Sequence, residues 1–356
     1  MKDIAIGIAV PLSGRAATLG TEVRQAIQLA IDQSNDKGAI AGITIRAAVA
    51  DDCSSVSTAE QAARMLCSEK ELAGVIGHYG SDTSLAAARI YQENGVPLLI
   101  PVASNPLLTE AGLTNVFRYT NRDDLTAQVI SRYLFTNLGK RKAVVIKTTT
   151  AYGNSMSAGF EKAFIQEGGA ILASLPVHEG EKDFSALVRS LAAAADLFFY
   201  GGTFEGAFLL QALRAARYPQ LLATGDGCWD TRNFLDIAAD AAEDAQGVLV
   251  LSASSAVGDV AGSAEFAARY ERLHGPIVNY ALNAYDTARI LLRAIGEAAL
   301  TGDVSRQRVM NIVRDLPFHF TGTANPNRLA WTTKGDHAAP ITRLNIVEKG
   351  RFKEVL

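Results

Sequence analysis

Polar residues that could bind a ligand follow two apolar, strand-like segments in the first part of the chain. Residues 75–77 run into HYGS at 78–81, and residues 98–100 run into PVAS at 101–104. Ligands of open α/β sheets bind beyond the carboxyl ends of the strands. Each loop supplies a serine hydroxyl, Ser81 or Ser104, together with backbone N–H groups, which is the chemistry of an anion site. One such serine can equally cap a helix, but two loops on neighbouring strands favour binding.

A candidate site of the opposite charge lies further along the chain. Asp226 stands between Gly225 and Gly227 after a short apolar segment, and the glycines allow a ligand to approach the backbone closely. Tyr152 follows another strand-like segment and could stack on a ligand or hydrogen-bond to it. Taken alone, Gly-Asp-Gly is also typical of a plain turn. A carboxylate here and an anion site elsewhere complement both charges of a zwitterion, so the sequence predicts an amino-acid ligand.

The motifs of common enzyme chemistries are missing from the sequence. Thr21 follows Gly20 where a phosphate-binding loop requires lysine, and no G-x-S-x-G elbow is present. The five histidines are scattered and form no metal-spaced pair. His78 stands where a strand meets a loop, so it could line a pocket or serve the fold. We therefore expect a binding protein rather than an enzyme, without cofactor or metal.

Composition narrows the class of partner. The formal net charge is -3, with 48% hydrophobic and 20% charged residues, as in soluble globular proteins. This balance gives no electrostatic reason to expect nucleic acid or anionic lipid as a partner. No apolar run approaches the roughly 18 residues that a spanning helix needs, so we expect no insertion into a membrane. The chain begins with MKDIA and enters an apolar strand-like run, so an exported protein would already have lost its signal peptide.

Three cysteines cannot all pair within one chain. Cys67 lies on the apolar stripe of a predicted helix, which is typical of a small core residue. Cys53 precedes that helix and Cys67 ends it, so the helix length keeps the two apart. Cys228 has no partner that the sequence assigns. We predict three free thiols.

Short, continuously apolar segments alternate with amphipathic helical segments along the whole chain. This alternation predicts an α/β fold with parallel sheets that are covered on both faces. The rhythm restarts after about residue 122, and 356 residues are too many for one ordinary core, so two similar domains are expected. No Pro- or Ser-rich linker separates them, which favours several short crossings over one tether.

In this order the segments resemble the leucine/isoleucine/valine-binding protein family, the type I periplasmic binding proteins of branched-chain amino-acid ABC transporters. The similarity extends nearly end to end, and its motifs are PLSG at 11–14, DD at 51–52, VIGH at 75–78, IPVASNP at 100–106, YG at 152–153, GEKDFS at 180–185, YGG at 200–202 and GDG at 225–227. The resemblance implies two Rossmann-like lobes, joined by a three-segment hinge, that close on a ligand. It implies an N-terminal lobe of residues 1–121 and 253–328 and a C-terminal lobe of residues 122–252 and 329–356.

The resemblance also implies roles for individual residues. Ser81 and Ser104 match hydroxyls that bind the ligand's carboxylate, and Asp226 matches the acidic residue that holds its ammonium group. The other implied ligand residues are Val102 and Ala103 through their backbone, Tyr152 as a pocket tyrosine, and Leu19, Tyr79, Thr203 and Tyr280 around the ligand's side chain. Tyr79 is bulkier, and Thr203 smaller, than the residues common in aliphatic-specific members. We therefore expect medium-sized neutral side chains, aliphatic or polar, and exclusion of charged ones.

The function that the resemblance implies is that of a periplasmic, monomeric solute receptor. It would bind a small neutral amino acid and deliver it to the membrane permease of an ABC importer. A ligand-sensing regulator of the same fold, similar to the cytoplasmic amide sensors, is the alternative. A signal peptide in the natural gene would separate the two.

Overall fold

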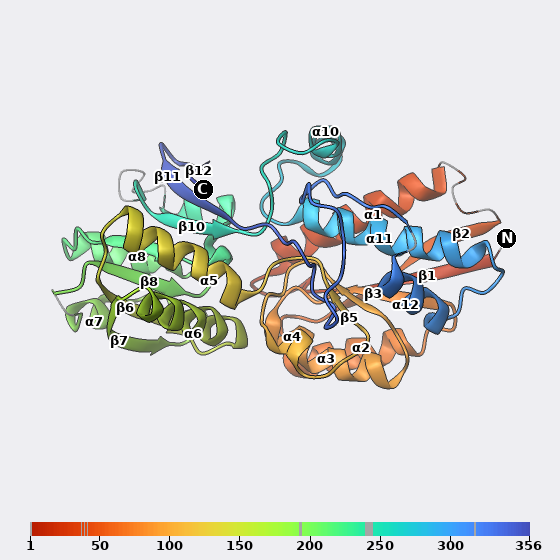
Figure 1. Ribbon diagram of the computed structural model, residues 1–356, viewed down its shortest axis with the longest axis horizontal. Helices are drawn as coiled ribbons and strands as arrows, with labels where there is room; N and C mark the ends of the chain where they lie inside the picture. Colours follow the sequence, from red (N-terminus) through yellow and green to blue (C-terminus); the bar gives the residue numbers. More distant parts are fainter. Residues whose placement is uncertain are drawn as a thin grey trace. The chain divides into compact units, whose positions relative to one another are not determined.

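The computed structural model describes residues 2–36, 38, 40, 42–191, 194–238, 245–316 and 318–356 (Figure 1). It divides into two compact units. Unit 1 comprises Met1–Asn121 and Ser254–Ile341, and unit 2 comprises Arg122–Ala253 and Thr342–Leu356. The chain therefore passes from one unit to the other three times.

Unit 1 is built on a five-stranded sheet in the order β2-β1-β3-β4-β5, and all its neighbouring strands are parallel. Its strands are β1 (Lys2–Val10), β2 (Ile43–Asp51), β3 (Leu72–Gly77), β4 (Leu98–Ile100) and β5 (Val116–Arg118). Its helices are α1 (Ala17–Asp36), α2 (Val56–Cys67), α3 (Ser81–Glu93), α4 (Leu107–Glu110), α10 (Ser263–His274), α11 (Ala281–Ala299) and α12 (Arg306–Asp315). Within this unit, α2, α3 and α4 lie along one face of the sheet and α1 and α11 along the other (Figure 1).

Unit 2 is built on a seven-stranded sheet in the order β12-β11-β10-β9-β8-β6-β7. Its strands are β6 (Lys142–Thr148), β7 (Ala170–Val177), β8 (Leu197–Gly201), β9 (Leu221–Thr224), β10 (Leu249–Ser252), β11 (Arg343–Glu348) and β12 (Arg351–Glu354). Its α-helices are α5 (Asp123–Arg132), α6 (Ala151–Gln166), α7 (Ser185–Arg189), α8 (Gly206–Ala215) and α9 (Asp236–Ala238). It also contains the π-helices η1 (Tyr133–Asn137) and η3 (Thr231–Leu235) and the 3-10 helix η2 (Asp226–Cys228).

The inner strands of each sheet are apolar because helices cover both of their faces, whereas the edge strands β2, β7 and β12 are partly exposed. In β6, Val144 and Ile146 pack into the cluster beneath α7 and α8. Val145, on the opposite face, packs with Phe160 and Phe164 of α6. Side chains alternate across a strand, so burial on both faces requires an unbroken apolar run. The predicted α/β fold with parallel sheets is confirmed, and the terminal hairpin β11–β12 adds an antiparallel edge to unit 2.

The third crossing lies later in the chain than the sequence predicts. The segment 329–341 belongs to unit 1, so this boundary falls at 341/342 instead of 328/329. Backbone hydrogen bonds explain the difference, since Arg118 N donates to Gly335 O at 2.8 Å and His337 N donates to Arg118 O at 2.9 Å. These contacts extend the edge of β5, and no local pattern in the sequence predicts them. The middle boundary shifts by one residue, to 253/254.

All three cysteines are free thiols in the structure. Cys53 is exposed, Cys67 is half-buried at the end of α2, and Cys228 is buried. Burial raises the pKa of the Cys228 thiol well above its usual value, so this thiol stays protonated and unreactive at neutral pH.

Candidate functional site

The two predicted anion-binding loops of unit 1 begin at the same edge of its sheet. β3 and β4 are parallel neighbours, with Val75 opposite Leu98. Their carboxyl ends therefore release residues 78–81 and 101–105 side by side. Gly77 permits this arrangement, because a Cβ atom there would lie 2.0 Å from the Ala9 carbonyl oxygen of β1, and its φ is +139°.

Ser81 is the first residue of α3, and its hydroxyl does not cap that helix. Gly80 occupies the cap position without a side-chain hydrogen bond. The Oγ of Ser81 is buried and has no hydrogen-bond partner within the described part of the chain. A buried polar group left unpaired costs about 1–3 kcal/mol. This hydroxyl at the positive end of a 13-residue helix is thus arranged to receive an anion.

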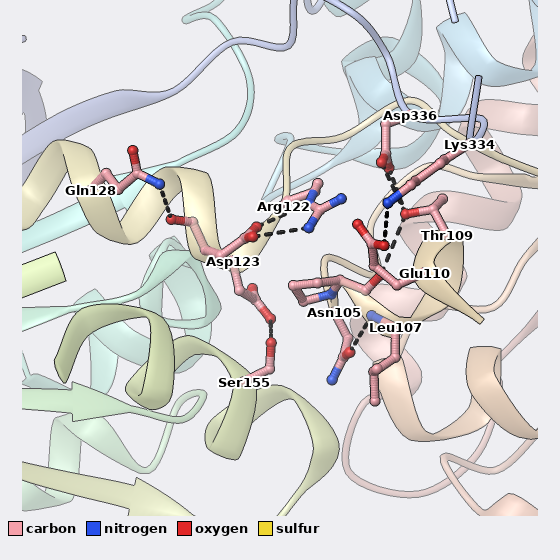
Figure 2. Close-up of polar contacts among 12 residues, drawn as sticks. Asn105, Leu107, Thr109, Glu110, Arg122, Asp123, Gln128, Ser155, Lys334 and Asp336 are labelled. Carbon is pink, nitrogen blue, oxygen red and sulfur yellow. Dashed lines mark hydrogen bonds and ion pairs between the residues drawn. The ribbon is translucent and has the colours of Figure 1, made fainter. Parts of the chain in front are cut away.

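Ser104 lies in the second loop, and it too leaves the capping of the next helix to a neighbour. Pro106 is the cap residue of α4, and Asn105 before it accepts a hydrogen bond at its Oδ1 from the backbone N of Leu107, the first residue of the helix, at 2.9 Å (Figure 2). Ser104, Val102 and Ala103 are all buried. Neither serine therefore occupies the cap position of a helix, and the Ser81 hydroxyl has no other partner within the described residues.

His78 supports the first loop from behind. It is fully buried, with Nδ1 2.7 Å from Asp52 Oδ2 and Nε2 3.2 Å from the Tyr91 hydroxyl. Its carbonyl oxygen accepts a hydrogen bond from Ser84 Oγ of α3. Of the two interpretations open from the sequence, the structure places His78 in the fold rather than in a pocket wall. Its partners, 26 and 13 residues away, were not identified from the sequence.

The remaining predicted residues of unit 1 lie on or beside its helices. Leu19 is in the first turn of α1, Tyr280 directly precedes α11, and these two helices pack together. Tyr79 is half-buried in the loop before α3. Glu22, which sequence reasoning missed, is a buried carboxylate of α1 that accepts hydrogen bonds from three backbone N–H groups around Tyr280, those of Val278, Asn279 and Ala281.

In unit 2, Asp226 and Tyr152 form one hydrogen-bonded group. Asp226 follows β9, is 5% exposed, and accepts a hydrogen bond from the Tyr152 hydroxyl at 2.8 Å. That hydroxyl in turn accepts from Gly227 N at 2.8 Å. A Cβ atom on Gly225 would come within 2.5 Å of it. The glycines around Asp226 therefore make room for Tyr152, which argues against a plain turn.

Burial raises the pKa of Tyr152 well above 10, and the charges of Asp226 and then Asp123 raise it further. Tyr152 is therefore a neutral hydrogen-bond donor to Asp226 at physiological pH. Asp123 is a second residue that sequence reasoning missed. It is fully buried in the first turn of α5 and accepts a hydrogen bond of 2.5 Å from Ser155 Oγ of α6 (Figure 2). The acidic pair at 123–124 that opens α5 was its only signal in the sequence.

Thr203 lies after β8 in unit 2 and is half-buried. Its hydroxyl donates a hydrogen bond of 2.7 Å to Glu205, whose carboxylate also accepts from Gly180 N at 2.7 Å. Glu205 is fully buried, so this carboxylate holds two loops of unit 2 together. The hydrogen bond fixes the direction of the Thr203 hydroxyl.

Two further features, a metal-binding cluster and a membrane-spanning helix, are absent from the part of the chain that the structure describes. Among these residues, no group of three or more His, Cys, Asp or Glu side chains could hold a metal ion. None of the described helices is long and apolar enough to cross a membrane.

Residues 3–351 match the periplasmic binding protein family. The chain is 31% identical over 304 residues to Leu/Ile/Val-binding protein homolog 3 of Brucella melitensis, covering 85% of this chain and 81% of that protein. It is also 31% identical to the Leu/Ile/Val-binding protein BraC3 of Rhizobium johnstonii over 307 residues, with the same coverage.

Solved structures show the same fold. The leucine-binding protein LivK of Thermotoga maritima superposes with a TM-score of 0.88 at 24% identity, covering 99% of this chain and 98% of that one. A periplasmic binding protein of Bordetella pertussis superposes with a TM-score of 0.87, also at 24% identity, over 99% of this chain and 100% of that one. With a match over nearly its full length and relatives above 30% identity, the chain belongs to the periplasmic binding protein family.

Proposed function

We propose that this protein is a periplasmic solute receptor that binds a small neutral amino acid and delivers it to the permease of an ABC importer. The observation that carries the proposal is the opposite chemistry of the two units. Unit 1 offers buried hydroxyls and the N-terminus of α3, whereas unit 2 offers the buried carboxylate of Asp226. These groups are complementary to the two charges of one zwitterion. The Leu/Ile/Val-binding names of the relatives support an amino acid as the ligand.

The roles follow from charge and position. We call Ser81, Ser104 and the backbone of residues 102–104 the anion site, and we propose that it binds the ligand's carboxylate. We call Asp226 with Tyr152 the carboxylate site, and we propose that it binds the ammonium group. The side-chain pocket would be lined by Leu19, Tyr79, Thr203 and Tyr280.

Delivery to a permease requires that the loaded receptor differ from the empty one. We propose that both units must engage the ligand together, because neither one offers partners for both of its charges. A ligand shifts a conformational equilibrium by its differential affinity for the two states, here favouring closure through the three crossings. Small-angle scattering should show a smaller radius of gyration after saturation with ligand. Identical profiles with and without ligand would contradict closure.

Calorimetry on protein that has been unfolded and refolded, to remove any carried-over ligand, tests the ligand class. Leucine, valine and threonine represent neutral side chains of medium size. Glutamate and arginine represent charged ones, which should bind far more weakly because burying an unpaired charge is costly. Leucinamide, without the carboxylate, and 4-methylpentanoate, without the amine, should each lose most of the affinity of leucine. Tight binding of either analogue, or of glutamate or arginine, would overturn the proposed ligand class.

The cellular location is tested separately. Fractionation of cells that express the natural gene should recover the protein in the periplasm. Recovery in the cytoplasm would favour the ligand-sensing regulator, an alternative that gains no support from relatives named as binding proteins.

A further inference from the structure

Behind the anion site, unit 1 contains a buried arginine whose hydrogen bonds reach three separate segments. Arg118, the last residue of β5, is fully buried. Its Nε donates to Asp336 Oδ1 at 2.8 Å, its Nη2 to Thr109 Oγ1 at 2.8 Å, and its Nη1 to the Asn105 carbonyl oxygen at 2.6 Å. Thr109 completes the group by donating to Asp336 Oδ2 at 2.9 Å (Figure 2). We call these four residues the Arg118 clamp.

The Asn105 carbonyl links the Arg118 clamp to the anion-site loop. Asn105 directly follows Ser104, and its own side chain accepts from Leu107 N at 2.9 Å. The residue that ends the anion-site loop is thus held from two sides, by Arg118 and by the start of α4. A guanidinium group presents its donors in a rigid planar fork, so it fixes direction as well as distance.

We infer that Arg118 and Asp336 are positioning residues for carboxylate recognition, acting through the backbone of residues 102–105. This inference rests on the proposed function. A buried guanidinium is costly unless every partner is in place, so the loop, Thr109 and Asp336 must keep one mutual arrangement. The backbone N–H groups and the Ser104 hydroxyl are then oriented before a ligand arrives. Such preorganisation reduces what binding loses in ordering the loop.

The clamp also joins the loop to two of the three crossings. Arg118 lies three residues before the boundary at 121/122, and Asp336 lies five residues before the boundary at 341/342. The backbone of Arg118 is bonded on both sides to Gly335 and His337. The two chain segments that leave unit 1 at these boundaries are therefore fastened to each other, and to the loop, at one arginine.

Hydrogen exchange of the ligand-free protein tests the positioning directly. In Arg118→Met, amide exchange of the peptide covering residues 101–110 should rise about tenfold or more, the equivalent of one lost hydrogen bond to a charged group. Arg306→Met is the matched control, because Arg306 is an arginine of unit 1 whose Nη2 donates to the carbonyl oxygens of Cys67 and Glu69, both at 2.8 Å. The control should leave residues 101–110 unchanged.

Equal exchange of that peptide in Arg118→Met and in the control would overturn the inference. Asp336→Asn provides the same test with a nearly isosteric change, should Arg118→Met fail to fold. It keeps one acceptor oxygen but removes the charge that the guanidinium requires.

The ratio of affinities for two ligands is a measurement that a general loss of stability would leave unchanged. The affinity ratio of leucine to leucinamide measures carboxylate recognition alone. In Arg118→Met and Asp336→Asn this ratio should fall about tenfold, while Arg306→Met should leave it unchanged. An equal loss for both compounds would assign the clamp a purely structural role and overturn the inference. If the unaltered protein binds no amino acid, the proposed function fails, and the exchange experiment still decides whether Arg118 positions the loop.

Discussion

The anion site of unit 1 and the carboxylate site of unit 2 differ in how charge is distributed. The anion site consists of neutral groups, the hydroxyls of Ser81 and Ser104 and backbone N–H groups, and the formal charges of Arg118 and Asp336 lie behind it and pair with each other. The carboxylate site concentrates its charge in Asp226, which Tyr152 orients through one hydrogen bond.

If the proposed roles hold, the ligand's carboxylate would be stabilised by many small dipoles, whereas its ammonium group would depend mainly on the charge of Asp226. Distributed dipoles should tolerate the loss of any single member, because the others remain. A single carboxylate leaves no substitute.

Removing the charge of the carboxylate site should have the largest effect on binding. Truncating one partner of a buried charge pair typically costs about 2–5 kcal/mol, so Asp226→Ala should weaken leucine binding at least about 30-fold by calorimetry. Asp196→Ala is the control, since that carboxylate of the same unit accepts backbone hydrogen bonds from Arg141 and Lys142. Affinity within a few-fold of the unaltered protein in Asp226→Ala would refute the assigned role.

Acid should destabilise the unit that holds the anion site. Burial lowers the pKa of His337 from 6.5 to about 4. The side chains around its ring are those of Tyr119, Trp331 and Asn325, and the carboxylate of Asp336 is adjacent in the chain. The folded state therefore favours the neutral ring, and above pH 6.5 the ring is neutral in the unfolded state as well, so His337 does not lower the free energy of unfolding there. That free energy falls as the pH drops towards 4, by about 3 kcal/mol in all.

The measurement is the free energy of unfolding of unit 1 at pH 7 and pH 5, monitored by the fluorescence of Trp331 in a Trp229→Phe background. His337→Gln should reduce the loss of stability between these two pH values. His178→Gln is the matched control for the substitution, because His178 lies in unit 2, outside the unit whose unfolding Trp331 reports. An unaltered pH dependence in His337→Gln would show that another group is responsible.

Weakening the orientation of Asp226, without removing its charge, should have an intermediate effect. Tyr152→Phe removes a donor to Asp226 and the acceptor of Gly227 N, at an expected cost of about tenfold in affinity. Tyr218→Phe is matched to it, because Tyr218 donates at 3.2 Å to the Leu191 carbonyl oxygen in the same unit. The control should lower the melting temperature without changing affinity. A Tyr152→Phe effect as large as that of Asp226→Ala would mean that orientation of the carboxylate matters as much to binding as its charge.

Single hydroxyl deletions in the anion site should have the smallest effects. Ser81→Ala and Ser104→Ala should each weaken binding about 2–10-fold, the net value of one hydrogen bond, and the double variant should combine the two losses. Ser68→Ala is the control, an exposed serine whose hydroxyl bonds to Met65 O. A loss of 30-fold or more from either single change would break the contrast between distributed and concentrated charge.

Much of the site's location could be predicted from the sequence, because it depends on local periodicity. Apolar runs that alternate with helical stripes indicate parallel strands, and polar residues at the ends of such strands gather at one edge of a sheet. That reasoning identified the loops of Ser81 and Ser104 and the glycine-flanked Asp226. The assignment of these residues to a ligand stays a prediction.

Only the tertiary structure decided which neighbour supports each loop. In the folded protein, Asn105 accepts a hydrogen bond from the start of α4, and His78 pairs with Asp52. Asp336 meets Arg118 across 218 positions of the chain. The backbone bonds between Arg118 and residues 335 and 337 likewise place the segment 329–341 in unit 1. Periodic patterns report on burial within one element. The pairing of buried charges depends on which distant segments share a low-dielectric interior, and spacing along the chain does not contain that information.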